Sequence, residues 1–470
     1  MSVMARRMRR PSSVGGWKGG LFEGQDPFRI CLFFLTIVTI SRVHVHFGLG
    51  ALRPALVLAA GALVYALVSP RVVNWPGLFR YWPSKVIAAL GVLACLSAPF
   101  GLSLGGAALF ILQDYSKVLV FAALLTAAFR KTSDVRLIVA AFVISAAILV
   151  YFTTFVFQLV AVNSGMMRLN HMYTYDSNDV GVILLMAVPL ALWLMGTVKR
   201  PGKILIALLL VGIGAAIARS GSRGTFVGAM ALGASLLWFV HHISLGRRLL
   251  IVGTISLGLL LSAPPGYWDQ MTTLLTPTED YNWTSNDGRK EVALRGLGYM
   301  MDYPVFGIGI DMFPRAEGTI SEKAQNHVAG TGIRWIAAHN SYVQAGAELG
   351  IPGLLLWCSL IVGGIVGMVR LRRRLPRSWA QGDPEQRFLY VSTAYLPAAY
   401  VGFAVPAFFV SFAWMDPIYL LSALFCGVHS AVRRRMMIDQ SGTASRSLSM
   451  HDRHIQAAHR PGRGRTARYA

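Results

Sequence analysis

Long apolar runs recur along almost the whole chain, and they constrain its fold more than any other feature. Runs such as 137–160, 180–197, 225–243 and 351–369 approach or exceed the roughly 18–20 residues that a helix needs to cross a bilayer. A single water-soluble core cannot absorb so many apolar segments. Only 14% of the residues are charged, whereas soluble domains carry about 25%. The sequence therefore predicts an all-α polytopic membrane protein.

The runs predict about twelve transmembrane helices. Nine of them fall within 30–263, a long loop with short amphipathic helices follows at 264–340, and three more spans fall within 341–432. The chain begins with a basic segment at 1–29 and ends with a basic tail at 433–470, which we expect to be disordered because it has few apolar residues. The predicted spans are 30–46, 54–69, 86–101, 116–129, 137–160, 179–197, 204–218, 225–243, 249–263, 341–369, 388–411 and 416–432.

Lysine and arginine are distributed unequally between the two sides of these spans. Of the 44 Lys and Arg residues, 32 lie in the segments on one side, and six of the remaining 12 lie in the long loop. By the positive-inside rule, the basic side is cytoplasmic. Both termini are then cytoplasmic, and the long loop is extracytoplasmic. The net charge of +23 reports this topology and an attraction to anionic membrane lipids, so we expect no nucleic-acid partner.

Neither the carboxylates nor the cysteines are arranged to hold a metal ion. The sequence has no DxD-type carboxylate pair, and Asp176 and Asp179 resemble helix caps because they flank the start of a span. The cysteines show no metal-ligand spacing and lie inside apolar runs, which favours four buried apolar thiols without a disulfide. They are Cys31, Cys95, Cys358 and Cys426. We therefore expect no metal and no other cofactor.

Three groups of residues on the outer side are candidates for chemistry. The first is the glycine-rich turn from Arg219 to Gly224, between two apolar runs. A helix that starts there directs its free N–H groups outward, and together with an arginine these groups can bind an anion. For Arg223, the alternative to an anion site is simple snorkelling to lipid headgroups. For Arg219, we favour snorkelling.

The second group is the start of a helix predicted at 289–302, inside the long loop. A cation in the first turn opposes the helix dipole, so Arg289 makes more sense beside a bound anion, although a solvated surface arginine is the simpler alternative. We expect its neighbours Lys290 and Arg295 to be solvated. An apolar stripe at helical spacing is formed by Leu294, Leu297 and Met301.

The third group lies where the long loop re-enters the membrane. An imidazole with its ordinary pKa of about 6.5 suits a general base near neutral pH, and His339 can reach both water and a membrane-held substrate. The alternative is a histidine that caps the next helix. Glu348 lies inside the following span, where an acidic residue is a functional candidate by default. It could instead hydrogen-bond a helix break at 350–353.

Together these stretches resemble the O-antigen ligase and polymerase family, the Wzy/WaaL-type membrane glycosyltransferases. Residues 219–228 are similar to the family's Arg-Gly turn. Residues 288–309 resemble "GR, about a dozen residues, then D-x-P-x-x-G-x-G", and 339–353 resemble "H-N-x-x-L, then E-x-G-x-x-G". The resemblance covers roughly 204–365. In one departure, family members often carry a tryptophan shortly after the loop arginine, and 291–298 has none.

The resemblance implies transfer of a glycan from a polyprenyl diphosphate carrier to an acceptor hydroxyl, without metal. Carried onto this sequence, it implies that Arg223 and Arg289 hold the diphosphate and that His339 is the catalytic residue, which takes or orients the proton of the acceptor. Direct displacement would invert the anomeric centre. The residues that would support these groups are Asn340, Glu348 and Arg219.

The resemblance also implies a bacterial inner-membrane protein whose active site faces the periplasm. The acceptor would be lipid A-core, another glycan or a protein, and other polysaccharide assembly proteins are expected partners. One alternative function is a lipid-linked-sugar flippase or polysaccharide transporter without catalysis. It predicts ionisable residues near the middle of the bundle, where these spans are almost free of charge. Another is a non-catalytic scaffold, for which both arginines would be dispensable.

Overall fold

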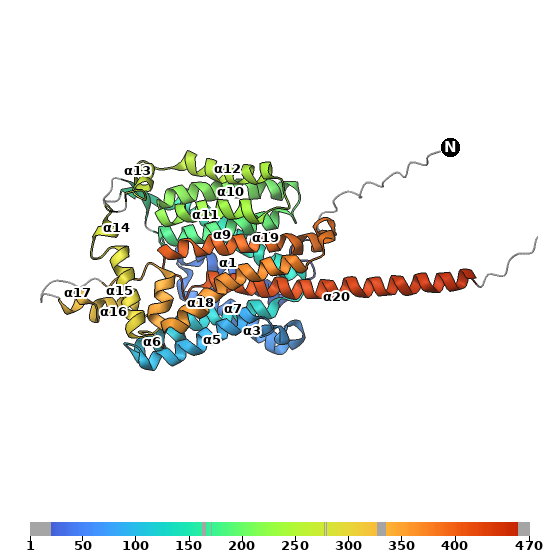
Figure 1. The fold of residues 1–470 in the computed structure, drawn as a ribbon, viewed down its shortest axis with the longest axis horizontal. Coiled ribbons are helices and arrows are strands. Elements are labelled where there is room, and N and C mark those ends of the chain that lie inside the picture. Colours follow the sequence, from blue (N-terminus) through green and yellow to red (C-terminus); the bar gives the residue numbers. More distant parts are fainter. Residues whose placement is uncertain are drawn as a thin grey trace, which may run out of the picture.

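The molecule is a bundle of long helices with a group of short helices over one end. The computed structural model describes residues 20–161, 166–170, 172–276, 278, 280–326 and 335–458. The long helices run roughly side by side, and the short helices α13 to α17 lie together at one end of the bundle (Figure 1). The last helix, α20, projects from the opposite end (Figure 1). The long loop and the chain that follows the last span therefore lie at opposite ends.

Each of the twelve predicted spans corresponds to a helix of the structure. Among the described residues, nine segments are long and apolar enough to cross a membrane, and α1 and α11 are shorter apolar helices. The all-α polytopic membrane fold is confirmed. The helices are α1 (Pro27–Ser41), α3 (Pro54–Val68), α5 (Trp82–Ser97), α7 (Ser116–Ala128), α8 (Thr132–Tyr151), α9 (Ser177–Met195), α10 (Arg200–Ser220), α11 (Arg223–Phe239), α12 (Leu245–Ser262), α18 (Ser341–Arg374), α19 (Pro384–Ala404) and α20 (Asp416–Ala458).

Shorter elements connect these helices. Outside the long loop they are α2 (Val43–His46), α4 (Trp75–Leu78), α6 (Leu104–Phe110), the 3-10 helices η1 (Leu49–Leu52), η2 (Pro70–Val72), η3 (Ala98–Phe100), η7 (Arg377–Gln381) and η8 (Pro406–Phe409), and the π-helical turns η4 (Ile111–Tyr115) and η5 (Phe152–Val156). One antiparallel hairpin, β1 (Gln158–Ala161) and β2 (Met167–Asn170), pairs Gln158 with Asn170.

The helix α9 lies at the centre of the bundle. Apolar residues cover it on every side, which is the pattern of a buried helix, and nearly all of its residues are buried. It packs against α8, α10, α11 and α19. Helices α3 and α12, by contrast, bury few residues and present most of their apolar surface outward, as expected of helices that face lipid.

The last helix differs from the prediction in its length. We predicted a span at 416–432 and disorder from 433 onward, whereas α20 continues as a helix to Ala458. A helix satisfies its own backbone hydrogen bonds, and the Arg, Met, Gln and Ala residues beyond the span are good helix formers. Residues 459–470, and 1–19 of the predicted N-terminal segment, lie outside the described residues. The four cysteines are free thiols, as predicted, but only Cys426 is buried: Cys31 and Cys358 are partly exposed and Cys95 is exposed, because their helices present these faces outward.

Candidate functional site

The long loop folds into short helices that share a small apolar core with the membrane bundle. They are α13 (Tyr267–Thr272), α14 (Tyr281–Thr284), α15 (Arg289–Asp302), α16 (Phe313–Thr319) and α17 (Glu322–Gln325). Helix α15 packs along the first turns of α18. The contact is close because α15 presents Gly296 to α18, where an added Cβ would lie 2.3 Å from Val343. The loop is therefore attached to the bundle through α15.

The predicted loop helix has the expected bounds but a different packing face. Its core face consists of Val292, Gly296 and Tyr299, whereas the predicted apolar stripe of Leu294, Leu297 and Met301 is 43–67% exposed. Arg295, expected to be solvated, instead forms a two-pronged ion pair with Glu317, whose side chain is 1% exposed. The prediction that Arg295 is solvated is therefore wrong. It failed because Glu317 lies on α16, and nothing in the sequence indicated that α16 packs beside α15.

Two of the motifs that carried the family resemblance are joined by backbone hydrogen bonds. The N–H of Ile308 donates to the carbonyl of Ala347 at 2.9 Å, and the N–H of Ile351 donates to that of Pro304 at 2.8 Å. These bonds are possible because Gly350 interrupts α18 with a φ of +68°. An added Cβ on Gly350 would lie 2.6 Å from the carbonyl oxygen of Pro304. The glycines of both motifs thus permit one close backbone contact.

Glu348 stabilises the same junction and is fully buried. Its carboxylate accepts hydrogen bonds from the backbone N–H of Asp311 at 2.8 Å, from that of Phe313 at 3.2 Å, and from the indole N–H of Trp414 at 2.5 Å. It therefore ties the start of α16 to α18 and to the segment before α20. The sequence left open whether Glu348 is a functional acid or hydrogen-bonds a helix break at 350–353. These contacts match the second possibility.

The two arginines of the glycine-rich turn, Arg219 and Arg223, make different contacts. Arg219 donates to the backbone carbonyls of Thr153 at 2.7 Å and Phe157 at 3.3 Å, so it holds the end of α8 and the adjoining turn η5. Snorkelling was the wrong expectation for this residue, because these carbonyls are left open by the π-helical end of α8. Gly221, with a φ of +57°, ends α10 and lets α11 begin two residues later.

Arg223 is the first residue of α11. Ser222 caps the helix by accepting the N–H of Thr225 at 3.1 Å. The guanidinium of Arg223 donates to the hydroxyl of Thr273 at 2.6 Å and forms an ion pair with Asp280, and both charged side chains are largely buried, at 17% and 11% exposed. Arg223 is thus held at a helix N-terminus, where backbone dipoles also favour an anion.

Arg289 lies beside Arg223 but is not neutralised. Burial, followed by the positive charges of Arg168 and Arg223, lowers the pKa of Arg289 to about 10, and Asp176 opposes this only in part. The side chain still carries its charge at neutral pH. It makes no hydrogen bond or ion pair with any residue in the described part of the chain. A half-buried cation of this kind, next to other cations, is a strong attractor for an anion.

A cavity of about 470 Å³ lies between these residues. It combines Arg223 and Arg289 with aromatic and apolar walls, and Lys290, expected to be solvated, also contributes to the wall with its ammonium 5.7 Å from the ring centre of Trp283. The lining residues are Arg223, Thr273, Leu274, Asp280, Trp283, Arg289, Lys290, Ala293, Phe408 and Phe409. The structure therefore brings together the two arginines that the sequence singled out.

His339 does not line this cavity, but its backbone contacts the segment that follows the cavity wall. It has a positive φ of 46°, which is rare for a residue other than glycine, and its backbone N–H donates to the hydroxyl of Ser411 at 2.9 Å. The segment of Ser411 follows directly on Phe408 and Phe409 of the cavity wall. Asn340 caps α18 by accepting the N–H groups of Tyr342 at 3.0 Å and Val343 at 3.2 Å. Asn340, and not His339, is thus the helix cap.

Arg168 is a member of the cationic group that sequence reasoning missed. It lies in β2 and donates to the carbonyl of Ser220 at 3.0 Å and to the side chain of Asn178 at 3.0 Å. One signal was available: arginine is scarce in the short outer loops, so each one there calls for an explanation.

Asp176 and Asp179 form a capping box at the start of α9, as predicted.

A comparison with known families agrees with these motifs. Residues 207–358 match the Wzy_C family model, described as O-Antigen ligase. The match supports the O-antigen ligase/polymerase family. The matched stretch contains all six site residues predicted from the sequence, while Arg168 precedes it. No match was found among curated proteins. Within the described residues, no group of three or more His, Cys, Asp or Glu side chains could hold a metal ion.

Proposed function

We propose that the protein is a metal-independent, inverting glycosyltransferase that moves a glycan from a polyprenyl diphosphate carrier to an acceptor hydroxyl, as an O-antigen ligase or as a polymerase of O-antigen or exopolysaccharide. One observation carries this proposal. Arg223 and Arg289 face one cavity, and Arg289 is charged but makes no ion pair with a described residue. The family match to an O-antigen ligase model supports it independently.

The arginines are suited to a diphosphate leaving group. When the bond between the anomeric carbon and the diphosphate breaks, its electron pair stays on the diphosphate oxygen, so negative charge develops there. Guanidinium groups bind phosphate oxygens in pairs and do not lose their proton at physiological pH. Arg223 at the N-terminus of α11 and Arg289 at that of α15 would bind the two phosphates. Arg168 would add positive charge from the third side.

His339 is the candidate for the proton. The acceptor oxygen attacks the anomeric carbon opposite the leaving diphosphate, and the hydroxyl proton passes to the imidazole or is oriented by it. Asn340 fixes the backbone next to His339 by capping α18. Glu348 and Arg219 act further away, by holding the loop junction and the end of α8 in place.

The surroundings follow from the same proposal. The protein lies in the bacterial inner membrane with both termini in the cytoplasm, and the cavity faces the periplasm. Its donor is a glycan on a long-chain polyprenyl diphosphate such as undecaprenyl diphosphate. Its acceptor is lipid A-core in lipopolysaccharide, another glycan or a protein, and other polysaccharide assembly proteins are partners.

Transfer by the purified protein tests the assignment. Arg223→Ala and Arg289→Ala should each lower kcat/KM by about 100- to 1,000-fold, because each removes a group that stabilises developing charge. His339→Ala should lower kcat while donor binding is retained. Arg315→Ala is the matched control, since Arg315 is an exposed loop arginine that does not line the cavity. Full activity of the Arg223 or Arg289 variant, or activity that a chelator abolishes and a divalent ion restores, would refute the proposal.

Gene deletion distinguishes the two activities within this class. Complete polymers that accumulate on the lipid carrier indicate a ligase, whereas single repeat units indicate a polymerase. If the single carrier-linked units accumulate on the cytoplasmic side of the membrane, the protein acts as a flippase instead.

A further inference from the structure

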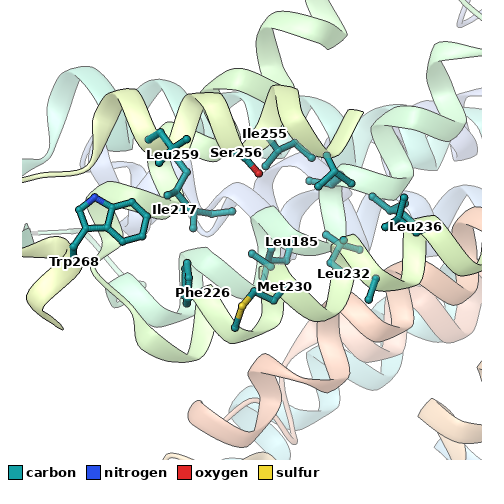
Figure 2. Close-up of a pocket in the computed structure, with 17 residues that line it drawn as sticks. Leu185, Ile217, Phe226, Met230, Leu232, Leu236, Ile255, Ser256, Leu259 and Trp268 are labelled. Atoms are coloured by element: carbon teal, nitrogen blue, oxygen red, sulfur yellow. The ribbon is translucent and has the colours of Figure 1, made fainter. Parts of the chain in front are cut away.

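A second hollow lies close to the arginine cavity, among helices whose apolar side chains face lipid. It is an apolar groove of about 540 Å³ between α11 and α12. Figure 2 shows side chains of α12, such as Ser256 and Leu259, facing Met230 and Leu232 of α11 across it, with Trp268 at one end and Leu236 at the other. We call this hollow the α11–α12 groove. Apart from Ser256 and the indole N–H of Trp268, its lining side chains are apolar.

The groove exists because neighbouring helices hold α11 and α12 apart. Helix α12 contacts α10 closely through glycines, and an added Cβ on Gly258 would lie 2.2 Å from the carbonyl oxygen of Val211. Helix α11 contacts α9 in the same way, because an added Cβ on Gly181 would lie 2.0 Å from Thr225. Small residues allow such close helix contacts in membranes. Each helix thus packs on a different partner, and a gap remains between them.

The groove opens sideways to the membrane. Met230 on α11 and Leu260 on α12 line it, yet they are 55% and 58% exposed. From Phe226 to Leu237 it follows twelve residues of α11, whose eleven rises of ~1.5 Å span about 16 Å. That is about half the ~30 Å apolar thickness of a bilayer. A lipid chain can therefore enter it laterally without leaving the apolar layer.

The arginine cavity and the groove share the same elements. Phe226 follows Arg223 by one helical turn on α11, so both lie on the same face of that helix. Trp268 closes the groove from α13, and Thr273, just after α13, hydrogen-bonds Arg223. Phe226 and Trp268 themselves make an edge-to-face contact with ring centres 6.4 Å apart. An anion-binding site thus continues into an apolar one, which is the pattern that an anionic head with a long apolar chain requires.

We propose that the α11–α12 groove holds the first part of the donor's polyprenyl chain while its diphosphate binds Arg223 and Arg289. The inference rests on the proposed function, and it adds the path by which the donor enters: sideways from the membrane, between α11 and α12. Trp268 and Phe226 mark the boundary between the diphosphate and the chain. The acceptor then approaches from another side.

Two neighbouring residues of α12 provide the test. Ser256 lines the groove and Leu257 does not, and both are exposed. Ser256→Trp fills the groove with an indole, while Leu257→Trp places the same indole outside it. Neither change removes a buried group, so both variants should fold, as equal thermal unfolding midpoints would verify. Binding of a long-chain polyprenyl diphosphate and of geranyl diphosphate is then measured with the full chain in nanodiscs of phosphatidylethanolamine and phosphatidylglycerol.

We expect Ser256→Trp to weaken binding of the long-chain diphosphate at least ten-fold and to leave binding of geranyl diphosphate within two-fold. Leu257→Trp should change neither. Unchanged long-chain binding in Ser256→Trp would show that the groove holds only bulk lipid, and an equal loss in both variants would show a general effect; either result overturns the inference. If long-chain binding is lost in Arg223→Ala and Arg289→Ala but not in Ser256→Trp, only the groove is refuted. If the unaltered protein binds neither diphosphate, the proposed function fails as well.

Discussion

Asp280 places a carboxylate on the guanidinium of Arg223 inside the arginine cavity. An incoming diphosphate and this carboxylate carry the same charge and compete for the same hydrogen-bond donor. The ion pair keeps Arg223 oriented and partly neutralised, whereas Arg289 has no such pair in the described part of the chain. The two arginines of the site are therefore in different electrostatic states.

Asp280→Asn should tighten donor binding. The amide keeps the size of the side chain but removes the charge that the diphosphate must displace, so we expect the Kd of the donor to fall by up to about ten-fold, or about 1.4 kcal/mol. The control is Asp287→Asn, because Asp287 pairs with Lys323 on the same loop at 2.5 Å and does not line the cavity. Weaker donor binding in Asp280→Asn would mean that Asp280 is needed to orient Arg223.

Glu348→Ala should act mainly by destabilising the fold and not by removing a contact with substrate. The substitution leaves the buried N–H groups of Asp311, Phe313 and Trp414 without their acceptor, at about 1–3 kcal/mol each. We expect a clearly lower Tm in detergent, with partial rescue in Glu348→Gln, which keeps one carbonyl oxygen. An unchanged Tm together with lost transfer would contradict this role and would make Glu348 a residue that acts on substrate.

Gly350→Ala tests the backbone junction between the two motifs. The new methyl group would meet the carbonyl of Pro304, and alanine avoids a φ of +68°, so we expect a destabilisation of about 1–3 kcal/mol and loss of transfer. Gly298→Ala is the matched control, because Gly298 is exposed on α15 and an added Cβ there has no neighbour within 4 Å. That change should be neutral or stabilising by about 0.5–1 kcal/mol. Equal midpoints for the two variants would refute the account.

The spans and the ends of the long loop could be predicted because hydropathy is a local property. The loop was predicted at 264–340, and the structure has it between Ser262 and Ser341, the end of α12 and the start of α18. The apolar run of each span consists of consecutive residues, and a cap such as Asp176 is adjacent in sequence to the helix that it starts. These features need no knowledge of distant neighbours.

The contacts of individual charged side chains could not be predicted in the same way. The pairs Arg295 with Glu317, Arg219 with Thr153, and Arg223 with Asp280 join residues far apart in the chain. Which of them meet depends on how the short loop helices pack, and a polar helix has no strong periodic signal for that. Arg168 was missed for the same reason, since its place beside Arg289 depends on the β-hairpin folding back over the start of α9 and the end of α10.

Arg289→Lys should make donor binding sensitive to alkaline pH. Burial, and then the charges of Arg168 and Arg223, lower the pKa of Arg289 to about 10, so the native site stays cationic and donor affinity should be flat between pH 6 and about 9. A lysine starts from an ordinary pKa of about 10.4, and the same surroundings lower it further. The anion binds the protonated form, so affinity is lost as pH rises through the lowered pKa of the lysine.

Donor Kd measured from pH 6 to 9 should rise steeply only in this variant, while Arg315→Lys, an exposed loop control, should match the native protein. A flat profile for Arg289→Lys would show that residue 289 does not meet the diphosphate, because its proton would then not be linked to binding.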